Sequence, residues 1–317
     1  MHHRPYPIIA GPTASGKTAL AIAFAKHLDG EVVSADSMQI YDMVSVGTAR
    51  PTFDEMDGIP HHLMGFLPLS SKYSVASYLE DAHRTFADIY ARGKLPVMCG
   101  GTGLYIQSFI ENRQLLEEQP DPTLRQHYIR IAEKEGNQAL LERLSLVDPV
   151  AAARLHVNDR NRIIRALEVF DTTGVTITEQ TARSHAVPSP YTPFLLVLDF
   201  HDRQVLYDRI NRRVDSMLEN GLLEEAQMVL RTNPDATVTQ AIGYKEFAPY
   251  FTGDISLCDA AEKLRQQTRR YAKRQLSWFH RMKNATTLWV DEHPSAESLI
   301  EEALRKYSEW EGGGAYE

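Results

Sequence analysis

The stretch Gly11 to Thr18, with the sequence GPTASGKT, is the most informative part of the chain. It matches the pattern G-x-x-x-x-G-K-[ST] at every defined position. A short apolar run, Pro7–Ala10, precedes it, and a run of strong helix formers, Ala19–Ala25, follows it. A strand, a glycine-bounded loop and a helix in this order predict a phosphate-binding loop at the start of a helix.

We expect this loop to hold a polyphosphate. Lys17 is expected to neutralise the terminal phosphate oxygens, and the hydroxyl of Thr18 is the candidate ligand for Mg²⁺. The pattern does not distinguish ATP or another nucleoside triphosphate from a diphosphate. The expected phosphate-binding residues are Gly11, Pro12, Thr13, Ala14, Ser15, Gly16, Lys17 and Thr18.

The same alternation of strand and helix continues after the loop. Glu31–Ala35, Lys94–Cys99 and Phe194–Asp199 are short apolar runs that predict further strands, and Val75–Arg92 has helical spacing and ends at Gly93. Strands that alternate with helices are typical of parallel sheets with helices on both faces. The sequence therefore predicts an α/β fold with a P-loop NTPase-like parallel sheet.

Strand patterns are missing between residues 117 and 188. Asp121-Pro122 and Asp148-Pro149 each combine an N-cap residue with proline at the first helical position, and Gly136 and Gly174 stand where helices should end. We expect an all-helical insertion domain. The predicted organisation is a first core part over 1–116, the insertion over 117–188, and a core continuation over 189–317.

Composition excludes several classes of protein. The chain has 317 residues, 43% hydrophobic and 24% charged, with a formal net charge of −8, which argues against coating nucleic acid by bulk charge. Its 2 cysteines exclude a disulfide framework and a zinc ribbon. We find no apolar run long enough to span a membrane and no signal-peptide pattern, and expect a cytoplasmic protein. His61-His62 lack metal-site spacing, so we interpret them as structural.

A single carboxylate stands out near the loop. The strand Lys94–Cys99 runs into Gly100-Gly101 without the acidic residue that a kinase or nucleotidase of this architecture supplies. Asp36 follows the strand Glu31–Ala35 instead. Because the carboxyl ends of parallel strands meet at one edge, Asp36, Thr102 and the phosphate loop should converge. An N-cap or a metal ligand remains the alternative for Asp36, and a simple turn residue the alternative for Thr102.

Seven ordered segments of the chain resemble those of the tRNA dimethylallyltransferase family. They lie between about Pro7 and Arg281, and with only 2 cysteines the chain resembles the bacterial type without a zinc finger. One departure is visible: after His61-His62-Leu63 the family usually continues with an apolar residue and an aspartate, where this chain has Met64-Gly65. The segments are GPTASGKT, SADSMQIY, IPHHL, ARGKLP with GGTGLYI, NDRNRIIRALEV, AIGYKE and YAKRQLSWFHR.

The resemblance implies transfer of a dimethylallyl group from dimethylallyl diphosphate to N6 of the adenosine 3′-adjacent to the anticodon. An adenine amino group is a poor nucleophile, so a general base is needed, and Asp36 is the candidate. Thr102 matches the family position near the amine. Arg213 matches a family arginine and would join Lys17 and Mg²⁺ in stabilising the leaving diphosphate; its alternative is an ordinary solvated helix charge.

The resemblance also implies that the anticodon stem-loop of tRNA is the partner, and we expect a monomer. Residues 260–283 contain eight Lys or Arg and one acid, a local charge of +7, on a chain that is acidic overall. A flipped adenosine is expected to enter a channel lined by Asp36, Ser37, Met38 and Gln39, although packing and surface exposure are the alternative for Met38 and Gln39. The other expected tRNA contacts are Arg125, Asn161, Arg162, Ile163, Ile164, Arg165, Arg269, Lys273 and Arg274.

Three other functions compete with this interpretation. A small-molecule P-loop kinase is disfavoured by the missing second carboxylate. An adenylate isopentenyltransferase shares the chemistry but has no use for the insertion and the basic tail helix. A non-enzymatic RNA-binding module gives no reason for Lys17 and Asp36 to occur together.

Overall fold

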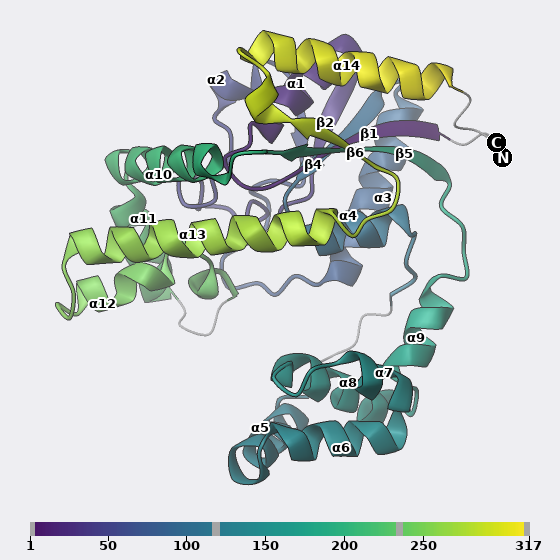
Figure 1. Ribbon diagram of the computed structural model, residues 1–317, viewed down its shortest axis with the longest axis vertical. Helices are drawn as coiled ribbons and strands as arrows, with labels where there is room; N and C mark the ends of the chain where they lie inside the picture. The colour runs from purple at the N-terminus through teal and green to yellow at the C-terminus, as the bar shows by residue number, and fades with distance from the viewer. Residues whose placement is uncertain (1–3, 116–120, 233–236, 314–317) are drawn as a thin grey trace. The chain divides into compact units, whose positions relative to one another are not determined.

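The computed structural model describes residues 4–115, 121–232 and 237–313. The chain divides into two compact units (Figure 1). Unit 1 spans Met1–Ile110 and Pro190–Glu317, and unit 2 spans Glu111–Ser189. The sequence pattern places the insertion at 117–188. Unit 2 is slightly longer, since it begins at 111 and ends at 189.

A parallel sheet forms the centre of unit 1. Its strands within the described residues are β1 (Arg4–Ala10), β2 (Gly30–Ser34), β3 (His61–His62), β4 (Leu95–Gly100), β5 (Tyr191–Asp199) and β6 (Ala285–Trp289). They pair in the order β3-β2-β4-β1-β5-β6, all parallel. The four strands expected from the sequence are confirmed. The sequence pattern did not predict β3, which has only two residues, or β6, in which threonines interrupt the apolar run.

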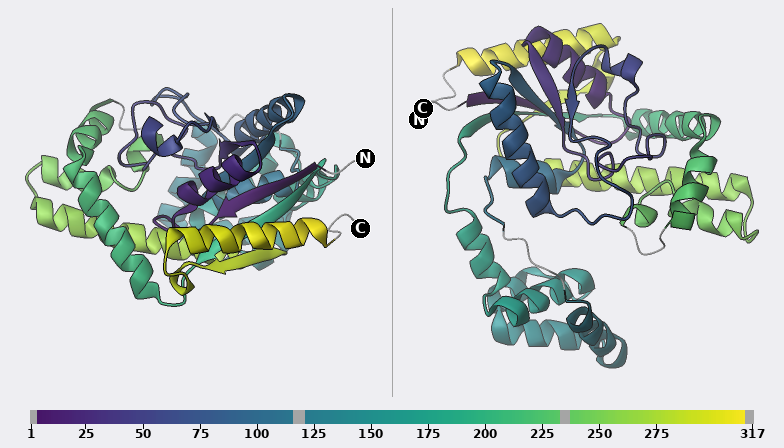
Figure 2. Two further views of the ribbon diagram at one scale, coloured as in Figure 1. Left: turned by 90° about the horizontal axis from the view of Figure 1, so that it is seen from above. Right: turned by 180° about the vertical axis from the view of Figure 1, so that it is seen from behind.

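Helices cover both faces of this sheet. α1 (Lys17–His27) and α14 (Ala296–Gly312) lie on one face, and α3 (Val75–Ala91) and α4 (Gly103–Ile110) lie on the other (Figures 1 and 2). Successive residues of a strand point to opposite faces, so Ile9 packs in the cluster with Phe24 and Tyr307. The opposite face carries aromatic contacts of Tyr6 with Phe86 and Phe109. The predicted α/β layers are confirmed.

A group of further helices completes unit 1. α10 (Arg203–Glu219) and α13 (Leu257–Phe279) pack against each other (Figure 1). The shorter elements are α2 (Phe53–Met56), α11 (Leu222–Thr232), η1 (Thr237–Gln240), η2 (Lys245–Phe247), α12 (Ala248–Phe251) and η3 (Val290–Glu292). Within the described ranges, no helix has both the length and the apolar character needed to cross a bilayer.

Unit 2 is entirely helical in its described part. Its helices are α5 (Pro122–Glu135), α6 (Asn137–Val147), α7 (Pro149–Arg154), α8 (Arg160–Thr173) and α9 (Ile177–Ser184). The side chain of Asp121 accepts hydrogen bonds from the first turn of α5, and Asp148 accepts one from the first turn of α7. α8 ends at Gly174, whose φ of 70° is left-handed. The expected caps therefore bound the helices.

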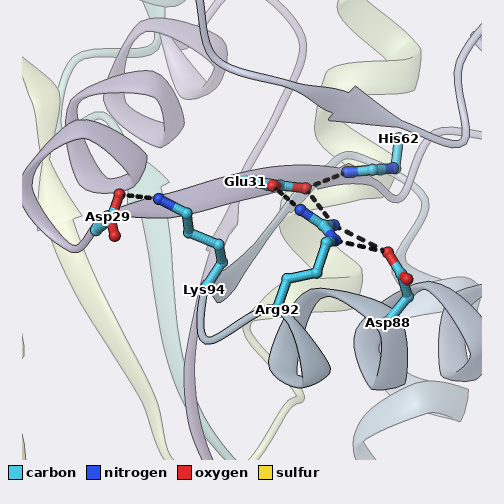
Figure 3. A network of polar contacts seen from close by, with 6 residues as sticks. All are labelled: Asp29, Glu31, His62, Asp88, Arg92 and Lys94. Carbon is cyan, nitrogen blue, oxygen red and sulfur yellow. Dashed lines mark hydrogen bonds and ion pairs between the residues drawn. The ribbon is translucent and has the colours of Figure 1, made fainter.

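A buried carboxylate fastens the start of β2 to its surroundings. Glu31, only 5% exposed, binds Arg92 through both carboxylate oxygens and lies 2.6 Å from Nε2 of His62 (Figure 3). Arg92 also reaches Asp88 one turn back on α3. The hydrogen bonds from Arg92, then that from His62, lower the pKa of Glu31 from 4.5 to about 2. His62 thus has the structural role expected for it.

We expect Glu31→Gln to destabilise the protein by about 2 kcal/mol at pH 7. The lowered pKa means that the ionised carboxylate stabilises the fold above pH 4.5, and that this stability is lost as pH falls from 4.5 towards 2. The difference between variant and parent should therefore shrink over that range. Denaturant unfolding at several pH values measures it. Asp88→Asn, at a largely exposed carboxylate, should cost under about 0.5 kcal/mol, and an equal loss in both variants would contradict the prediction.

Candidate active site

The phosphate loop connects β1 to α1. Gly16 is the N-cap of α1 with φ of 98°, and Ala14 has φ of 63°, so the loop combines two left-handed positions. An added Cβ at Gly11, whose φ is 144°, would lie 2.8 Å from the carbonyl oxygen of Leu198 on β5. Backbone N–H groups of a glycine-bounded loop and of the first helical turn are typically unpaired and form a site for an anion.

Lys17 lies in this loop with its charge partly desolvated. Its Nζ donates to the carbonyl oxygen of Pro12 at 2.6 Å. Burial lowers the pKa of Lys17 to about 8, and the nearby positive charge of Arg213 acts in the same direction, while Cys99 and Asp36 oppose the shift. A bound anion would stabilise the charged form of Lys17 further and raise its pKa again.

Other residues hold the loop in place. Ser15 Oγ donates to the carbonyl oxygen of Pro12 at 2.8 Å, and Nε of Arg209 on α10 donates to the carbonyl oxygen of Ala14 at 2.8 Å. The hydroxyl of Thr18, in the first turn of α1, makes no side-chain hydrogen bond within the described residues. Thr18 therefore offers a free oxygen, the ligand type that Mg²⁺ prefers.

Asp36 follows the carboxyl end of β2. Its Oδ1 accepts hydrogen bonds from the backbone N–H groups of Met38 at 2.9 Å and Gln39 at 3.4 Å. Oδ2 has no hydrogen-bond partner in the part of the chain that the structure describes. One oxygen thus fixes the carboxylate while the other remains available as a proton acceptor.

Thr102 lies next to Asp36, in the turn between β4 and α4. Its Oγ1 accepts from the backbone N–H of Ser37 at 3.0 Å, and the Thr102 N–H donates to the carbonyl oxygen of Ala35 at 3.1 Å. An added Cβ at Gly100 would collide with that same carbonyl oxygen, so the two turns approach closely. The convergence expected from strand order is confirmed.

Arg213 brings a second cation to this group from α10. Burial lowers the pKa of its guanidinium, the carboxylates of Asp36 and Glu55 oppose that shift, and the charge of Arg209 adds to it. Arg213 makes no ion pair within 4.0 Å among the described residues. A partly buried, unpaired cation beside Lys17 is suited to a multiply charged anion.

The sequence interpretation missed three residues of the site: Arg209, Tyr271 and Gln275. Tyr271 is half-buried on α13, and its hydroxyl lies near the side chains of Asp36, Thr102 and Gln275. Oε1 of Gln275 accepts a hydrogen bond from the backbone N–H of Thr13 at 2.9 Å. The available signal was two polar residues four positions apart on the inner face of an amphipathic helix.

Gln39 differs from its expected role as a reader of an adenine edge. Its Oε1 accepts from Ser34 Oγ at 3.2 Å, and its Nε2 donates to the carbonyl oxygens of Thr48 and Ala49. Both ends of the amide are thus engaged within the protein, and its side chain fastens the turn after β2 to the following loop. The packing alternative also describes Met38, which lies against a core cluster.

That loop is anchored from a distance by Glu225 on α11. The buried carboxylate accepts hydrogen bonds from the backbone N–H groups of Ser45 at 2.7 Å and Gly47 at 2.7 Å, and from the hydroxyl of Tyr244 at 2.9 Å. Glu225 therefore holds the segment that continues from Asp36, although it lies far away in the sequence.

The basic side chains of α13 fall into two groups. Arg265 pairs with Asp215 of α10 and with Glu262, and Arg269 bonds Asn211 of α10 at 2.9 Å and Glu262 at 2.8 Å. These two arginines join helices, and Arg269, an expected tRNA contact, is partly exposed and already bonded within the protein. Arg270, Lys273 and Arg274 are exposed. A groove of about 270 Å³ beside α10 includes Tyr207, Arg269, Arg270 and Lys273 in its lining.

In unit 2, some of the residues expected to contact RNA are buried and others are exposed. Ile163 and Ile164 are fully buried in the core of the unit, so their side chains do not reach a surface, which corrects that expectation. Arg125 pairs with the buried carboxylate of Glu168 at 3.1 Å. The exposed members of the set are Asn161, Arg162 and Arg165.

The chain is similar to known protein families and proteins over most of its length. It matches the family described as IPP transferase over residues 39–282 and the family described as Isopentenyl transferase over residues 6–64. A tRNA dimethylallyltransferase of Enterococcus faecalis is 48% identical, covering 86% of this chain and 87% of that protein. The corresponding protein of Bacillus subtilis is 44% identical, covering 92% of each.

Solved structures lead to the same group of proteins. The full-length tRNA isopentenylpyrophosphate transferase of Bacillus halodurans has a TM-score of 0.71 and 40% identity, covering 96% of both chains. A eukaryotic dimethylallyltransferase acting on tRNA has a TM-score of 0.79 and 29% identity, covering 96% of this chain and 78% of that chain.

Proposed function

This chain belongs to the IPP transferase family, and from that premise we propose that it transfers a dimethylallyl group from dimethylallyl diphosphate to N6 of the adenosine 3′-adjacent to the anticodon in tRNA. It is a prenyl-transferring enzyme, as are its curated relatives named tRNA dimethylallyltransferase. In the reaction, the bond between N6 and the allylic carbon forms, the carbon–oxygen bond to diphosphate breaks, and one N6 proton is released.

The free Oδ2 of Asp36 is the observation that carries this proposal. It belongs to a carboxylate held by Met38 N–H, beside Thr102 and close to the charges of Lys17 and Arg213. Asp36 accepts the N6 proton as the new bond forms, and the hydroxyl of Thr102, already bonded to Ser37, orients the amine.

The phosphate loop acts as the clamp for the leaving group. Lys17, Arg213 and the loop N–H groups stabilise the negative charge that develops on the diphosphate. The Thr18 hydroxyl fits Mg²⁺ as an oxygen ligand, and the ion, when bound, neutralises part of that charge. The remaining Mg²⁺ ligands would include oxygens of the diphosphate itself.

We propose that tRNA is held by exposed polar and basic side chains of both units. Asn161, Arg162 and Arg165 of unit 2 contact the anticodon stem-loop, and Lys273 and Arg274 of α13 contact backbone phosphates. Phosphate contacts of this kind position RNA without reading its sequence. We further propose that the protein acts as a monomer in the cytoplasm, where its tRNA substrate is modified.

A small-molecule kinase is less consistent with this site. β4 ends in Cys99 and Gly100 with no carboxylate. β5 does end in Asp199, but its oxygens are taken by Arg203, by the N–H of Phe200 and by Nε2 of His280. Curated relatives named for tRNA likewise speak against an adenylate isopentenyltransferase.

Mass analysis of nucleosides tests the function directly. Purified protein, unmodified tRNA, Mg²⁺ and dimethylallyl diphosphate should yield dimethylallylated adenosine at the position next to the anticodon and one equivalent of diphosphate. The same protein with ATP and small-molecule acceptors is the comparison. Robust ADP formation without prenylated tRNA would overturn the proposal in favour of a kinase.

We expect the double charge reversal Lys273→Glu with Arg274→Glu to weaken tRNA binding and to reduce the dependence of log Kd on log salt concentration by about 2. Each side chain neutralises one phosphate, so removing both removes two released counterions. Filter binding over a salt series measures the slope. Lys263→Glu, at the other end of α13, is the comparison, and an unchanged slope in the double variant would make Lys273 and Arg274 ordinary solvated charges.

A further inference from the structure

α13 turns two polar side chains towards the site, one helical turn apart. Gln275 is only 5% exposed, and Tyr271 is half-buried. Buried glutamine is uncommon, because an amide removed from water is costly unless both its ends are bonded. The position of Gln275 therefore needs a reason beyond packing.

The amide of Gln275 joins two loops that come from different strands. Its Oε1 accepts the backbone N–H of Thr13 in the phosphate loop at 2.9 Å, and its Nε2 donates to the carbonyl oxygen of Gly101 after β4 at 3.0 Å. One partner is a donor and the other an acceptor, so the amide has a single satisfactory orientation. An added Cβ at Gly101 would lie 2.2 Å from Nε2, so a side chain there would displace the amide of Gln275.

Tyr271 extends this connection to the residues proposed for chemistry. Its hydroxyl lies near the side chains of Thr102 and Gln275. Burial, and then the nearby negative charge of Asp36, raise the pKa of the Tyr271 hydroxyl, so it stays protonated at neutral pH. Thr102 in turn contacts Ser37, the neighbour of Asp36.

We infer that Gln275, supported by Tyr271, is a positioning residue that locks the phosphate loop to the turn carrying Thr102. The amide sets the separation between the diphosphate and the acceptor amine, although it touches neither. This inference rests on the proposed function. The helix α13 would then carry both the exposed basic side chains and the buried amide that holds the phosphate loop in position.

Gln275→Met tests the inference, because methionine has a similar length and no hydrogen-bonding amide. We expect Kd for inorganic pyrophosphate with Mg²⁺, measured by calorimetry, to rise about tenfold, and kcat to fall about tenfold. Kd for tRNA should stay within about twofold of the parent, since the exposed face of α13 is unchanged. A general loss of structure would instead alter all three quantities and the Tm together.

Gln204→Met is the matched control. Gln204 lies on α10 and also uses its amide, donating to Asp208 at 2.8 Å, but it is exposed. We expect this variant to bind pyrophosphate as the parent does. If Gln275→Met does not fold, Gln275→Leu, which also lacks the amide and adds no charge, takes its place and should also bind pyrophosphate more weakly.

The outcomes separate the inference from the function on which it rests. A parent protein that prenylates tRNA, together with a folded Gln275 variant of unchanged pyrophosphate affinity and kcat, would overturn the inference alone. A parent protein that binds pyrophosphate but forms no prenylated tRNA would contradict the proposed function. The pyrophosphate affinity of Gln275→Met would still show whether the Gln275 amide holds the phosphate loop in position.

Discussion

Asp36→Asn should lower kcat by at least about 10²-fold while leaving the affinity for tRNA within about twofold of the parent. Asparagine retains an oxygen that can accept the N–H groups of Met38 and Gln39, so the turn after β2 is preserved. It loses the basic oxygen at the position of Oδ2. Single-turnover rates, with tRNA and dimethylallyl diphosphate both saturating, measure the chemical step separately from binding.

Asp36→Ala removes the turn acceptor as well as the base. A lower kcat in Asp36→Ala than in Asp36→Asn would therefore measure how much Asp36 contributes by holding the turn after β2. Asp54→Asn, at an exposed carboxylate on α2, provides a comparison with the same change of charge. The assignment of Asp36 as the base would fail if Asp36→Asn weakened tRNA binding but turned over at the rate of the parent.

Lys17→Met should weaken the binding of pyrophosphate with Mg²⁺ by about 10²-fold, the scale of a charge-assisted hydrogen bond to phosphate. The Lys17 Nζ now bonds only the carbonyl oxygen of Pro12, so its removal should leave the fold intact. Calorimetry measures the affinity, and the Tm checks the fold. Lys26→Met, at an exposed lysine on the same helix, is the control.

The pH dependence of the same binding follows from the lowered pKa of Lys17. The lysine is protonated below pH 8 and loses its charge as pH rises through about 8, so pyrophosphate affinity should fall over that range. Pyrophosphate itself also titrates, and a Lys17→Arg variant, charged throughout, corrects for this. If parent and Lys17→Arg had the same pH profile, Lys17 would not be the titrating group.

Much of the fold was predictable because local signals agree with one another. The apolar run Pro7–Ala10, the glycines of the loop and the helix formers after Thr18 all indicate the same strand, loop and helix. The caps Asp121 and Asp148 bound helices where expected. The strand β6 was missed because ATTLW has no local hydrophobic pattern, and it is a strand only because β5 lies beside it.

The site was predictable in part. Lys17 and Asp36 are recognisable from motifs, and the order of parallel strands brings their loops to one edge. The exposure of the side chains expected to contact tRNA was harder to predict from the sequence. Ile163 and Ile164 lie next to exposed residues in the sequence but on the inner side of α8, and Arg269 is bonded to Asn211 of α10.

By itself the sequence determined that this protein has a phosphate loop on a parallel sheet, a carboxylate at the adjacent strand end and a family of prenyl transferases to which it belongs. Only the tertiary structure decided which polar groups are free and which are already bonded. Gln39 and Gln275 are both amides, yet Gln39 fastens its own loop whereas Gln275 joins two loops more than 170 residues away from it in sequence. Hydrogen-bond partners so far apart along the chain are set by packing, since no local pattern encodes their distance.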